Sequence, residues 1–432
     1  MNKLGSYKTH RYNMFISILL LTLYLVATLP TNAQTILLEN VSIIDGKSDF
    51  VRHRQFILIE NDVISKIGPH PYSSDIENIT RLNYSGYYVL PGLIDAHVHL
   101  ATDPSDTDRI ELSEQRLSIM LRNGITGVRD MAGDVRQLAY LARQAGLDEI
   151  ISPDIYYSAL MAGPIFFDDP RTKAASKGYE SGTAAWMLGV SPDDNLDLLV
   201  AAAKGSGASG IKLYADMSGE LVKRIIKSAN QQNMPVWAHA SVIPSMPSDA
   251  VNAGVGSLSH ATLLAWESSE RKPASGKSRN SETLIDVSHP RFKSLLIAMR
   301  DKQIFLEPTL LIYNDGTRAQ VFENGVKATK AAYEAGVPLI VGTDENIDIE
   351  NFTHLPLINE MIALVDLVGM AEMDVIKATT INSAVLLGID HQVGAVENGK
   401  KANLLVVKSN PIDDLRNLKS VIAVFKNGKK VE

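Results

Sequence analysis

The sequence predicts an α/β fold, a (β/α)8 TIM barrel with a small β-sandwich module built from both ends of the chain. Two observations support this prediction. Between residues 91 and 390, short apolar runs alternate with helical stretches, which is the pattern of parallel strands joined by helices. At 432 residues, the chain is also longer than the roughly 250 residues that such a barrel needs, so a second module is expected.

The second module is predicted from the two end segments, residues 34–90 and 391–432. Both are rich in β-forming residues, and their strands are separated by Gly and Asn-Asp turns. Because the barrel lies between them in the sequence, we expect the two segments to meet beside it. The expected strands of this module cover residues 35–45, 55–68, 83–92, 402–411 and 420–432.

The barrel region is predicted to contain eight strands that alternate with helices. The strands are short apolar runs, and the helices show apolar positions at helical spacing. The expected strands cover residues 88–99, 125–130, 153–159, 210–214, 235–240, 256–261, 304–310 and 338–344. The expected helices cover residues 107–123, 134–145, 193–206, 218–232, 245–254, 290–302 and 324–336, with two more at 354–369 and 370–388.

Two connections, residues 160–192 and 262–289, are unusually long for loops of a barrel. Each follows a strand, on the face where barrel enzymes build their active sites. We therefore expect the first loop to be a substrate loop or lid. The second is polar enough to be partly disordered.

Residues 1–33 are predicted to be a secretory signal peptide and no part of the fold. Basic residues are followed by an apolar run from Met14, and Thr31 and Ala33 supply the small residues of a cleavage site before Gln34. The alternative is a membrane anchor, but the apolar run is shorter than the roughly 20 residues of a spanning helix. We expect an exported protein, periplasmic or extracellular, with no stable membrane anchor after cleavage.

Composition narrows the classes of function. Removing residues 1–33 lowers the number of Lys and Arg residues from 42 to 39 against 49 Asp and Glu, so the mature chain has a net charge of −10. An exported acidic protein is not expected to bind nucleic acid. The absence of cysteine excludes disulfides, thiolate metal sites and a cysteine nucleophile. Both a monomer and a homo-oligomer are compatible with the sequence.

Six candidate metal ligands lie at or just past the ends of predicted barrel strands. The carboxyl ends of such strands meet at one mouth of the barrel. The first two are histidines spaced two residues apart on one strand, so they face the same way. Imidazole nitrogens and carboxylates suit zinc, manganese or iron. The candidates are His97, His99, Lys212, His239, His260 and Asp344.

Lys212 needs its own explanation, because a protonated lysine repels a metal. Burial beside two cations favours loss of its proton, and a neutral lysine can add carbon dioxide to form a carbamate that bridges two metals. Two such divalent ions, zinc in the first instance, share a hydroxide that is a strong nucleophile near neutral pH. The alternative is an ordinary barrel lysine in a site with one metal, with His239 as a ligand and His260 as an acid or base.

With these motifs the chain resembles the amidohydrolase superfamily over nearly its whole mature length. The shared pattern is His-x-His on strand one, Lys on strand four, His on strands five and six, and Asp on strand eight. The segments LPGLIDAHVH, GITGVRD, GTD and GAVENGKKANLLVV resemble most the branch that holds imidazolonepropionases and Xaa-Pro dipeptidases. One departure is MAGPIFFDDPR, which stands where dipeptidase-like members carry Gly-Gly-His and weakens the case for a peptide substrate.

The resemblance implies roles for the six residues. The two strand-one histidines would bind one metal together with Asp344. Carbamylated Lys212 would bridge that metal to a second one, held by His239 and His260. Asp344 would also accept the proton of the attacking water and pass it to the leaving amine, as general base and then acid.

Several other residues fall near the predicted mouth. Asp130 and Glu307 end strands two and seven, and we expect both to form salt bridges within the barrel rim. Any of four further residues could hold a substrate carboxylate or oxyanion, although most Arg and Tyr residues on loops do no such thing. These substrate-binding candidates are Tyr157, Arg171, Tyr214 and Tyr313.

The predicted function is hydrolysis of a C–N amide bond in a small molecule by a metal-bridged hydroxide. The substrate would be a dipeptide such as Xaa-Pro, an N-acyl amino acid or a cyclic amide. The alternatives are a lactonase or esterase with the same site, and an imidazolonepropionase-like enzyme with one metal. Nucleobase deaminases of this superfamily generally lack the strand-four lysine, so Lys212 argues against deamination. A binding protein that had lost catalysis would typically lack one of the six residues.

Overall fold

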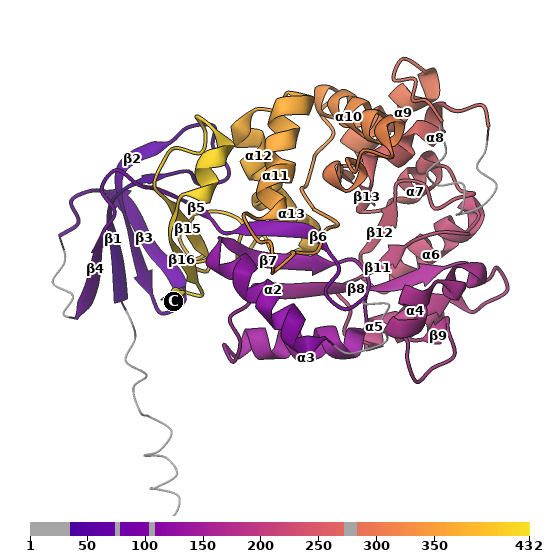
Figure 1. Ribbon diagram of the computed structural model, residues 1–432, viewed down its shortest axis with the longest axis horizontal. Coiled ribbons are helices and arrows are strands. Elements are labelled where there is room, and N and C mark those ends of the chain that lie inside the picture. The colour runs from indigo at the N-terminus through magenta and orange to yellow at the C-terminus, as the bar shows by residue number, and fades with distance from the viewer. Residues whose placement is uncertain (1–34, 74–77, 103–108, 272–282) are drawn as a thin grey trace, which may run out of the picture.

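The computed structural model describes residues 35–73, 78–102, 109–271 and 283–432. The predicted signal peptide lies outside these ranges. Figure 1 shows two parts side by side, a sheet module at one end and a larger body in which helices surround a set of strands. Within the described ranges, no helix combines the length and the apolar character needed to cross a membrane.

An eight-stranded sheet forms the smaller module and joins the two ends of the chain. Strand β1 pairs with β4 in parallel along its first residues and with β5 along its last residues, while β2 runs antiparallel to it. From the C-terminal segment, β15 pairs antiparallel with β5. The strands are β1 (Thr35–Ile43), β2 (Arg52–Glu60), β3 (Val63–Pro69), β4 (Ile79–Asn83), β5 (Tyr88–Pro91), β15 (Leu404–Val407), β16 (Val421–Lys426) and β17 (Lys429–Lys430).

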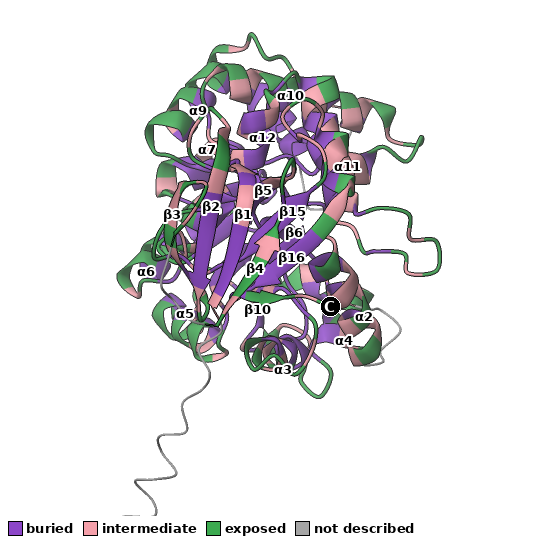
Figure 2. Cartoon of the chain, turned by 90° about the vertical axis from the view of Figure 1, so that its left-hand side faces the viewer, coloured by how far each residue is buried: buried purple, intermediate pink, exposed green. Residues whose placement is uncertain are grey.

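The core of this module lies between strands from the two chain ends. Leu38 and Ile57 of the N-terminal segment share one buried apolar cluster with Leu404 and Phe425 of the C-terminal segment. Figure 2 faces this sheet and shows β1 and β2 largely in the colour of buried residues. Burial of apolar surface, at roughly 25 cal/mol per Å², therefore holds the two ends together, and the predicted meeting of the chain ends is confirmed.

Parallel strands form the larger body, and nearly all their residues are buried, as is usual for parallel sheets covered by helices. The predicted barrel fold is confirmed. The run 88–99, expected as one strand, is divided between the two modules, because β5 pairs with β15 whereas β6 pairs with β7. The barrel strands are β6 (Leu93–Val98), β7 (Ile125–Asp130), β8 (Asp154–Ala162), β11 (Gly210–Leu213), β12 (Val236–His239), β13 (Ser257–Ser259) and β14 (Phe305–Glu307).

The eighth barrel position is held by an extended segment and no regular strand. Ile340 N–H donates to the Leu306 carbonyl of β14 at 3.0 Å, and the Val341 carbonyl accepts from Ala96 of β6 at 2.9 Å. The segment therefore bridges the last barrel strand and the first. Gly342 permits this close approach, since a β-carbon there would lie 2.6 Å from the β-carbon of His97.

Amphipathic helices cover the barrel from outside, and their starts are set by polar caps. Asp134, Asn195 and Ser218 each accept a backbone N–H in the first turn of the helix that follows. The helices are α2 (Ile110–Arg122), α3 (Val135–Gly146), α5 (Leu196–Gly205), α6 (Gly219–Gln231), α7 (Pro247–Ala253), α9 (Pro290–Asp301), α10 (Ala319–Glu334) and α11 (Pro356–Ala363).

The stretch 370–388, expected as one helix, is two helices, α12 (Glu372–Ala378) and α13 (Ile381–Leu387). The break falls at Thr379 and Thr380. Both hydroxyls donate to the Ile376 carbonyl, which offers the backbone an alternative to a continued helix. The prediction failed here because apolar spacing continues smoothly across the break.

The first long loop has short elements of its own. Strand β8 runs on to Ala162 and is followed by η1 (Pro164–Asp168) and α4 (Pro170–Ala175). The loop then returns through β9 (Thr183–Ala184) and β10 (Met187–Gly189), and β10 pairs in parallel with the end of β8. The loop is thus anchored to the barrel at both ends. The second long loop starts with η2 (Ala261–Leu264) and α8 (Ala265–Ser268), and residues 272–282 lie outside the described part.

Candidate active site and metal centre

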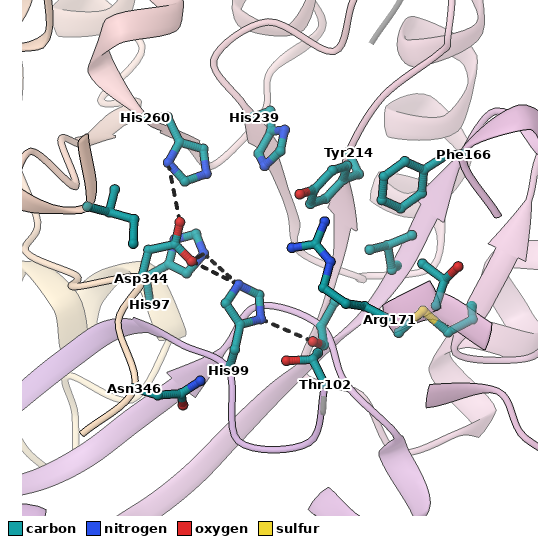
Figure 3. Close-up of a pocket in the computed structure, with 15 residues that line it drawn as sticks. His97, His99, Thr102, Phe166, Arg171, Tyr214, His239, His260, Asp344 and Asn346 are labelled. Atoms are coloured by element: carbon teal, nitrogen blue, oxygen red, sulfur yellow. Dashed lines mark hydrogen bonds and ion pairs between the residues drawn. The ribbon is translucent and has the colours of Figure 1, made fainter. Parts of the chain in front are cut away.

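A pocket of about 370 Å³ opens at the carboxyl ends of the barrel strands. Figure 3 shows a group of histidines on one side of it, and Tyr214 and Phe166 on the other. Polar and apolar side chains share its wall, as is usual for small-molecule sites. The lining residues are His97, His99, Thr102, Ala132, Leu160, Phe166, Arg171, Thr172, Met187, Tyr214, His239, His260, Ile312, Asp344 and Asn346.

Three of the predicted metal ligands converge at one point of this pocket. One nitrogen from each of His97 and His99 and one oxygen of Asp344 lie within 4.8 Å of one another. Asp344 Oδ1 is 3.0 Å from His99 Nε2 and 3.4 Å from His97 Nε2. The histidines meet because they lie two residues apart at the end of β6. This donor set, two imidazoles and a carboxylate, fits one divalent ion of the zinc type.

A buried glutamate orients the first histidine. Glu307, at the end of β14, accepts a hydrogen bond from His97 Nδ1, so Nε2 faces His99 and Asp344. Glu307 also forms an ion pair with buried Arg129, whose guanidinium lies 4.6 Å from the Trp237 ring centre. Burial alone would raise the pKa of Glu307, but His97 and Arg129 outweigh it and lower that pKa to about 2.

Two buried aspartates accept backbone hydrogen bonds from the segments around this cluster. Asp95 accepts from the backbone N–H of His97 and of Thr343, both at 3.1 Å, and so ties β6 to the segment that carries Asp344. Asp130 accepts from the N–H of Leu100 at 2.6 Å. The expectation of a salt bridge is therefore met by Glu307, whereas Asp130 instead holds the backbone that follows β6.

The electrostatics of the three ligands differ. Burial lowers the pKa of His97, and this outweighs the opposite effect of Glu307 and Asp344. For His99, burial acts in the same direction, but Asp344 outweighs it and raises the pKa. Burial would raise the pKa of Asp344, yet His97, His99 and His260 together hold it well below its usual range. Asp344 is therefore ionised at neutral pH.

Two site residues adopt a left-handed backbone that non-glycine residues rarely use. Asp344 has φ 54° and His260 has φ 69°. Such a conformation costs on the order of 1–3 kcal/mol and is typical of functional positions. Backbone hydrogen bonds hold both in place, from Asp344 N–H to the His97 carbonyl at 2.9 Å and from His260 N–H to the Glu307 carbonyl at 2.9 Å. The fold therefore directs both side chains into the pocket at some cost.

His239 and His260 belong to the same group of histidines, and the ring centres of His97 and His260 are 5.2 Å apart. His239 ends β12, His260 follows β13, and their ring centres are 4.6 Å apart. His260 Nδ1 is 2.7 Å from the Thr309 hydroxyl and 3.9 Å from Asp344 Oδ2. Burial holds the pKa of His260 well below its usual value, so the ring is neutral, as a metal ligand must be.

Lys212 lies on β11, which pairs with β12, the strand that ends at His239. It is fully buried, and its ammonium nitrogen is 2.9 Å from the Ser259 hydroxyl, to which it donates. Ser259 in turn donates to Glu307 at 3.4 Å. A chain of polar contacts thus joins Lys212 to His97 through Ser259 and Glu307.

The four substrate-binding candidates are divided by the structure. Arg171 and Tyr214 line the pocket, and Tyr313 lies beside it with its ring centre 6.1 Å from that of His260. Tyr157 does not line the pocket, since its hydroxyl lies near Gly207. Successive residues of a strand face opposite ways, and Leu160 of the same strand lines the pocket. Phe166, Thr102 and Asn346 also line the pocket but were not predicted from the sequence. No motif marks these residues, and their types alone do not indicate a binding site.

Comparisons with known proteins show which family the chain resembles. Residues 88–431 match the model of the amidohydrolase family. The chain is 23% identical over 414 residues to an imidazolonepropionase of Thermoplasma volcanium, covering 89% of this chain and 91% of that protein. It is 20% identical over 395 residues to a 5-methylthioadenosine/S-adenosylhomocysteine deaminase of Halalkalibacterium halodurans, covering 86% and 84%.

A solved structure has the same fold. A Xaa-Pro dipeptidase with bound methionine superposes with a TM-score of 0.74 at 24% identity, covering 92% of this chain and 100% of that chain. At this level of identity the likeness supports the fold alone.

Proposed function

Because the chain belongs to the amidohydrolase family, whose members are hydrolases of carbon–nitrogen bonds, we propose that it cleaves the amide bond of a small molecule. The convergence of His97, His99 and Asp344 in a pocket of about 370 Å³ carries this proposal. A dipeptide such as Xaa-Pro, an N-acyl amino acid or a cyclic amide is of a size that such a pocket can enclose.

We propose two divalent ions, zinc in the first instance, as cofactors. The two β6 histidines and Asp344 would hold one ion. His239 and His260 would hold the other. Lys212, as a carbamate formed with carbon dioxide, would be a ligand shared by the two ions. The burial of Lys212 on β11, next to the strand that ends at His239, supports this arrangement. Bound divalent ions supply Lewis acidity and make water a nucleophile near neutral pH.

The protein's own groups would move the proton. Asp344 is ionised, as its lowered pKa indicates, so it can accept a proton from the attacking water. It would then return that proton to the leaving nitrogen, which must be protonated to depart as an amine. Glu307 would keep His97 in one tautomer and orientation throughout.

Hydrolysis assays on a panel of amides test this proposal. The panel contains Xaa-Pro dipeptides, N-acyl amino acids and cyclic amides. The expected result is amine release that a chelator abolishes and added zinc restores. If metal-loaded protein cleaves lactones or esters but no amide, the proposal is wrong. Release of ammonia from adenine nucleosides would place the chain with the deaminases instead.

We also propose that the enzyme is exported, to the periplasm or the extracellular space. The support is the pattern of residues 1–33, a basic start, an apolar run and a small-residue cleavage site. Mass spectrometry of the protein made in a bacterial host should find a chain that begins at Gln34. An intact N-terminus in the membrane fraction would contradict export as a cleaved protein.

A further inference from the structure

We propose that Arg171 is the specificity residue of this pocket and binds a carboxylate on the leaving-amine side of the substrate. This inference rests on the proposed function and adds the substrate class. It favours amides whose leaving nitrogen is attached to a carbon that carries a carboxylate. Neutral amides, ureas and nucleosides lack this group.

Hydrogen bonds to Asp169 fix the conformation of the Arg171 side chain. Asp169 accepts from Arg171 Nε at 3.1 Å and from Nη2 at 2.8 Å, and it also caps helix α4 by accepting the Arg171 backbone N–H at 2.9 Å. One carboxylate thus fixes both the helix start and the guanidinium. Such a fixed group loses little conformational entropy when it binds a ligand.

The guanidinium retains N–H groups for a ligand. Asp169 uses two of its five N–H groups, and the pKa of Arg171 is raised first by that hydrogen bond and further by one with the Tyr214 hydroxyl. Within the described part of the chain, this leaves two N–H groups, which is the number that a bidentate carboxylate contact needs. The side chain is half-exposed and lines the pocket, so these groups can reach a bound molecule.

Tyr214 packs against both Phe166 and His239 on the wall of the pocket. Its ring centre lies 3.9 Å from that of His239 and 4.3 Å from that of Phe166. Figure 3 shows the Arg171 guanidinium between His99 and Tyr214. Arg171 and the candidate metal ligands thus line the same pocket, so a substrate whose carboxylate is bound by Arg171 would place its scissile bond in the cavity that these ligands line.

Backbone contacts hold the start of the loop that carries Arg171 against the residues that follow Tyr214. Gly163 N–H donates to the Ala215 carbonyl at 2.8 Å, and a β-carbon at Gly163 would lie 2.1 Å from the Asp216 carbonyl oxygen. The loop that carries Arg171 thus touches the loop that carries Tyr214. Leu160, Met187 and Ile312 supply apolar wall, which suits an apolar side chain on the substrate.

Matched substrate pairs test the anchor. N-acetyl derivatives of alanine, leucine, phenylalanine and proline are each used as the free acid and as the primary amide. We expect the wild-type enzyme to prefer the acids in kcat/KM. Arg171→Met should lower kcat/KM for the acids by about 10- to 100-fold, the effect of losing a charge-assisted hydrogen bond, and should lower it much less for the amides. Asp169→Asn should give a smaller loss of the same kind.

Lys173→Met is the matched control. Lys173 lies on the same short helix, is exposed and does not line the pocket, so its loss removes one positive charge without touching the anchor. The control should keep the preference for acids. A preference that survives Arg171→Met, or equal rates for acids and amides in the wild type, would overturn the proposal.

Binding without turnover separates the anchor from the proposed reaction. Thermal unfolding of the full chain is measured with each acid and each amide as ligand. Acids that raise the Tm of the wild type but not of Arg171→Met support the anchor even if none is hydrolysed, in which case only the proposed function fails. If no acid raises the Tm and amides are cleaved, the anchor fails and the function stands.

Discussion

The two halves of the candidate metal centre are built differently. His97, His99 and Asp344 are braced by carboxylates, since Glu307 orients His97 and Asp95 ties β6 to the Asp344 segment. His260 and Lys212 are instead contacted by the hydroxyls of Thr309 and Ser259, and the His239 ring packs against those of Tyr214 and His260. The first half therefore presents a preformed site that contains one ionised carboxylate ligand, Asp344. The second would gain its negative charge only from a carbamate on Lys212.

Asp344 belongs to the first half and also lies 3.9 Å from His260 Nδ1 of the second half, so its loss should have the largest effect. Asp344→Asn keeps the side-chain shape but removes a charged ligand and the proposed proton acceptor. We expect kcat/KM to fall by about 10⁴-fold, the upper range for loss of an acid–base group, together with loss of bound metal. Metal analysis by mass spectrometry and amide hydrolysis measure both. Asp348→Asn, an exposed change four residues away, serves as the control. Retention of full activity in Asp344→Asn would contradict its proposed role.

Lys212→Ala addresses the second half alone. Two metals per chain should fall to one or none, with activity reduced by about 10²-fold, because one Lewis acid and its bridge are lost. Lys212→Glu is the matched variant, since it restores a carboxylate at the same buried place and should recover part of the metal. One metal per chain in the wild type, unchanged by Lys212→Ala, would show that the second half is not a metal site.

Glu307→Gln removes the charge that orients His97 in the first half of the metal centre. The metal affinity should fall by about 10- to 100-fold, the usual effect of losing a group that orients a histidine ligand. Buried Arg129 also loses its charge partner, so the free energy of unfolding should fall by about 3–5 kcal/mol. Zinc titration and chemical denaturation measure the two effects. Ser259→Ala, which removes one longer contact to Glu307, is expected to change metal affinity less. An unchanged affinity in Glu307→Gln would show that packing alone orients His97.

Glu360 gives the smallest effect and concerns stability alone. It accepts the N–H groups of Leu310 and Leu311, just after the Thr309 that contacts His260, and burial raises its pKa to about 8. The folded state therefore holds this proton more tightly than the unfolded state. The stability that this bound proton contributes is complete below pH 4.5 and is lost as the pH rises through 8, by on the order of 5 kcal/mol at most.

Glu360→Gln should flatten this part of the pH dependence. Denaturation curves at pH 5, 6, 7 and 8 compare it with wild type and with Glu334→Gln, an exposed position on α10. The difference between wild type and Glu360→Gln isolates this group from all others that titrate. Parallel pH profiles for the two proteins would show that Glu360 stays ionised when the protein is folded.

The sequence by itself determined the parts that depend on local pattern. The alternation of strands and helices is local, and so is the spacing of His97 and His99, which places both on one face of β6. The placement of Tyr214 beside the pocket followed from the same rule, applied two residues beyond Lys212. Strand ends in a parallel barrel meet at one mouth, so the sequence could also gather His239, His260 and Asp344 there.

Only the tertiary structure decided contacts between residues that are distant in sequence. Glu307 and His97 are separated by 210 residues, and no local pattern connects them. The clamp of Asp169 on Arg171 is local, but its place in the pocket depends on how Gly163 packs against the loop of Tyr214. Tyr157 is a residue that the sequence placed near the mouth of the barrel, but in the structure its side chain does not line the pocket. Side-chain direction and long-range hydrogen bonds follow from how elements pack, and periodicity carries no information about them.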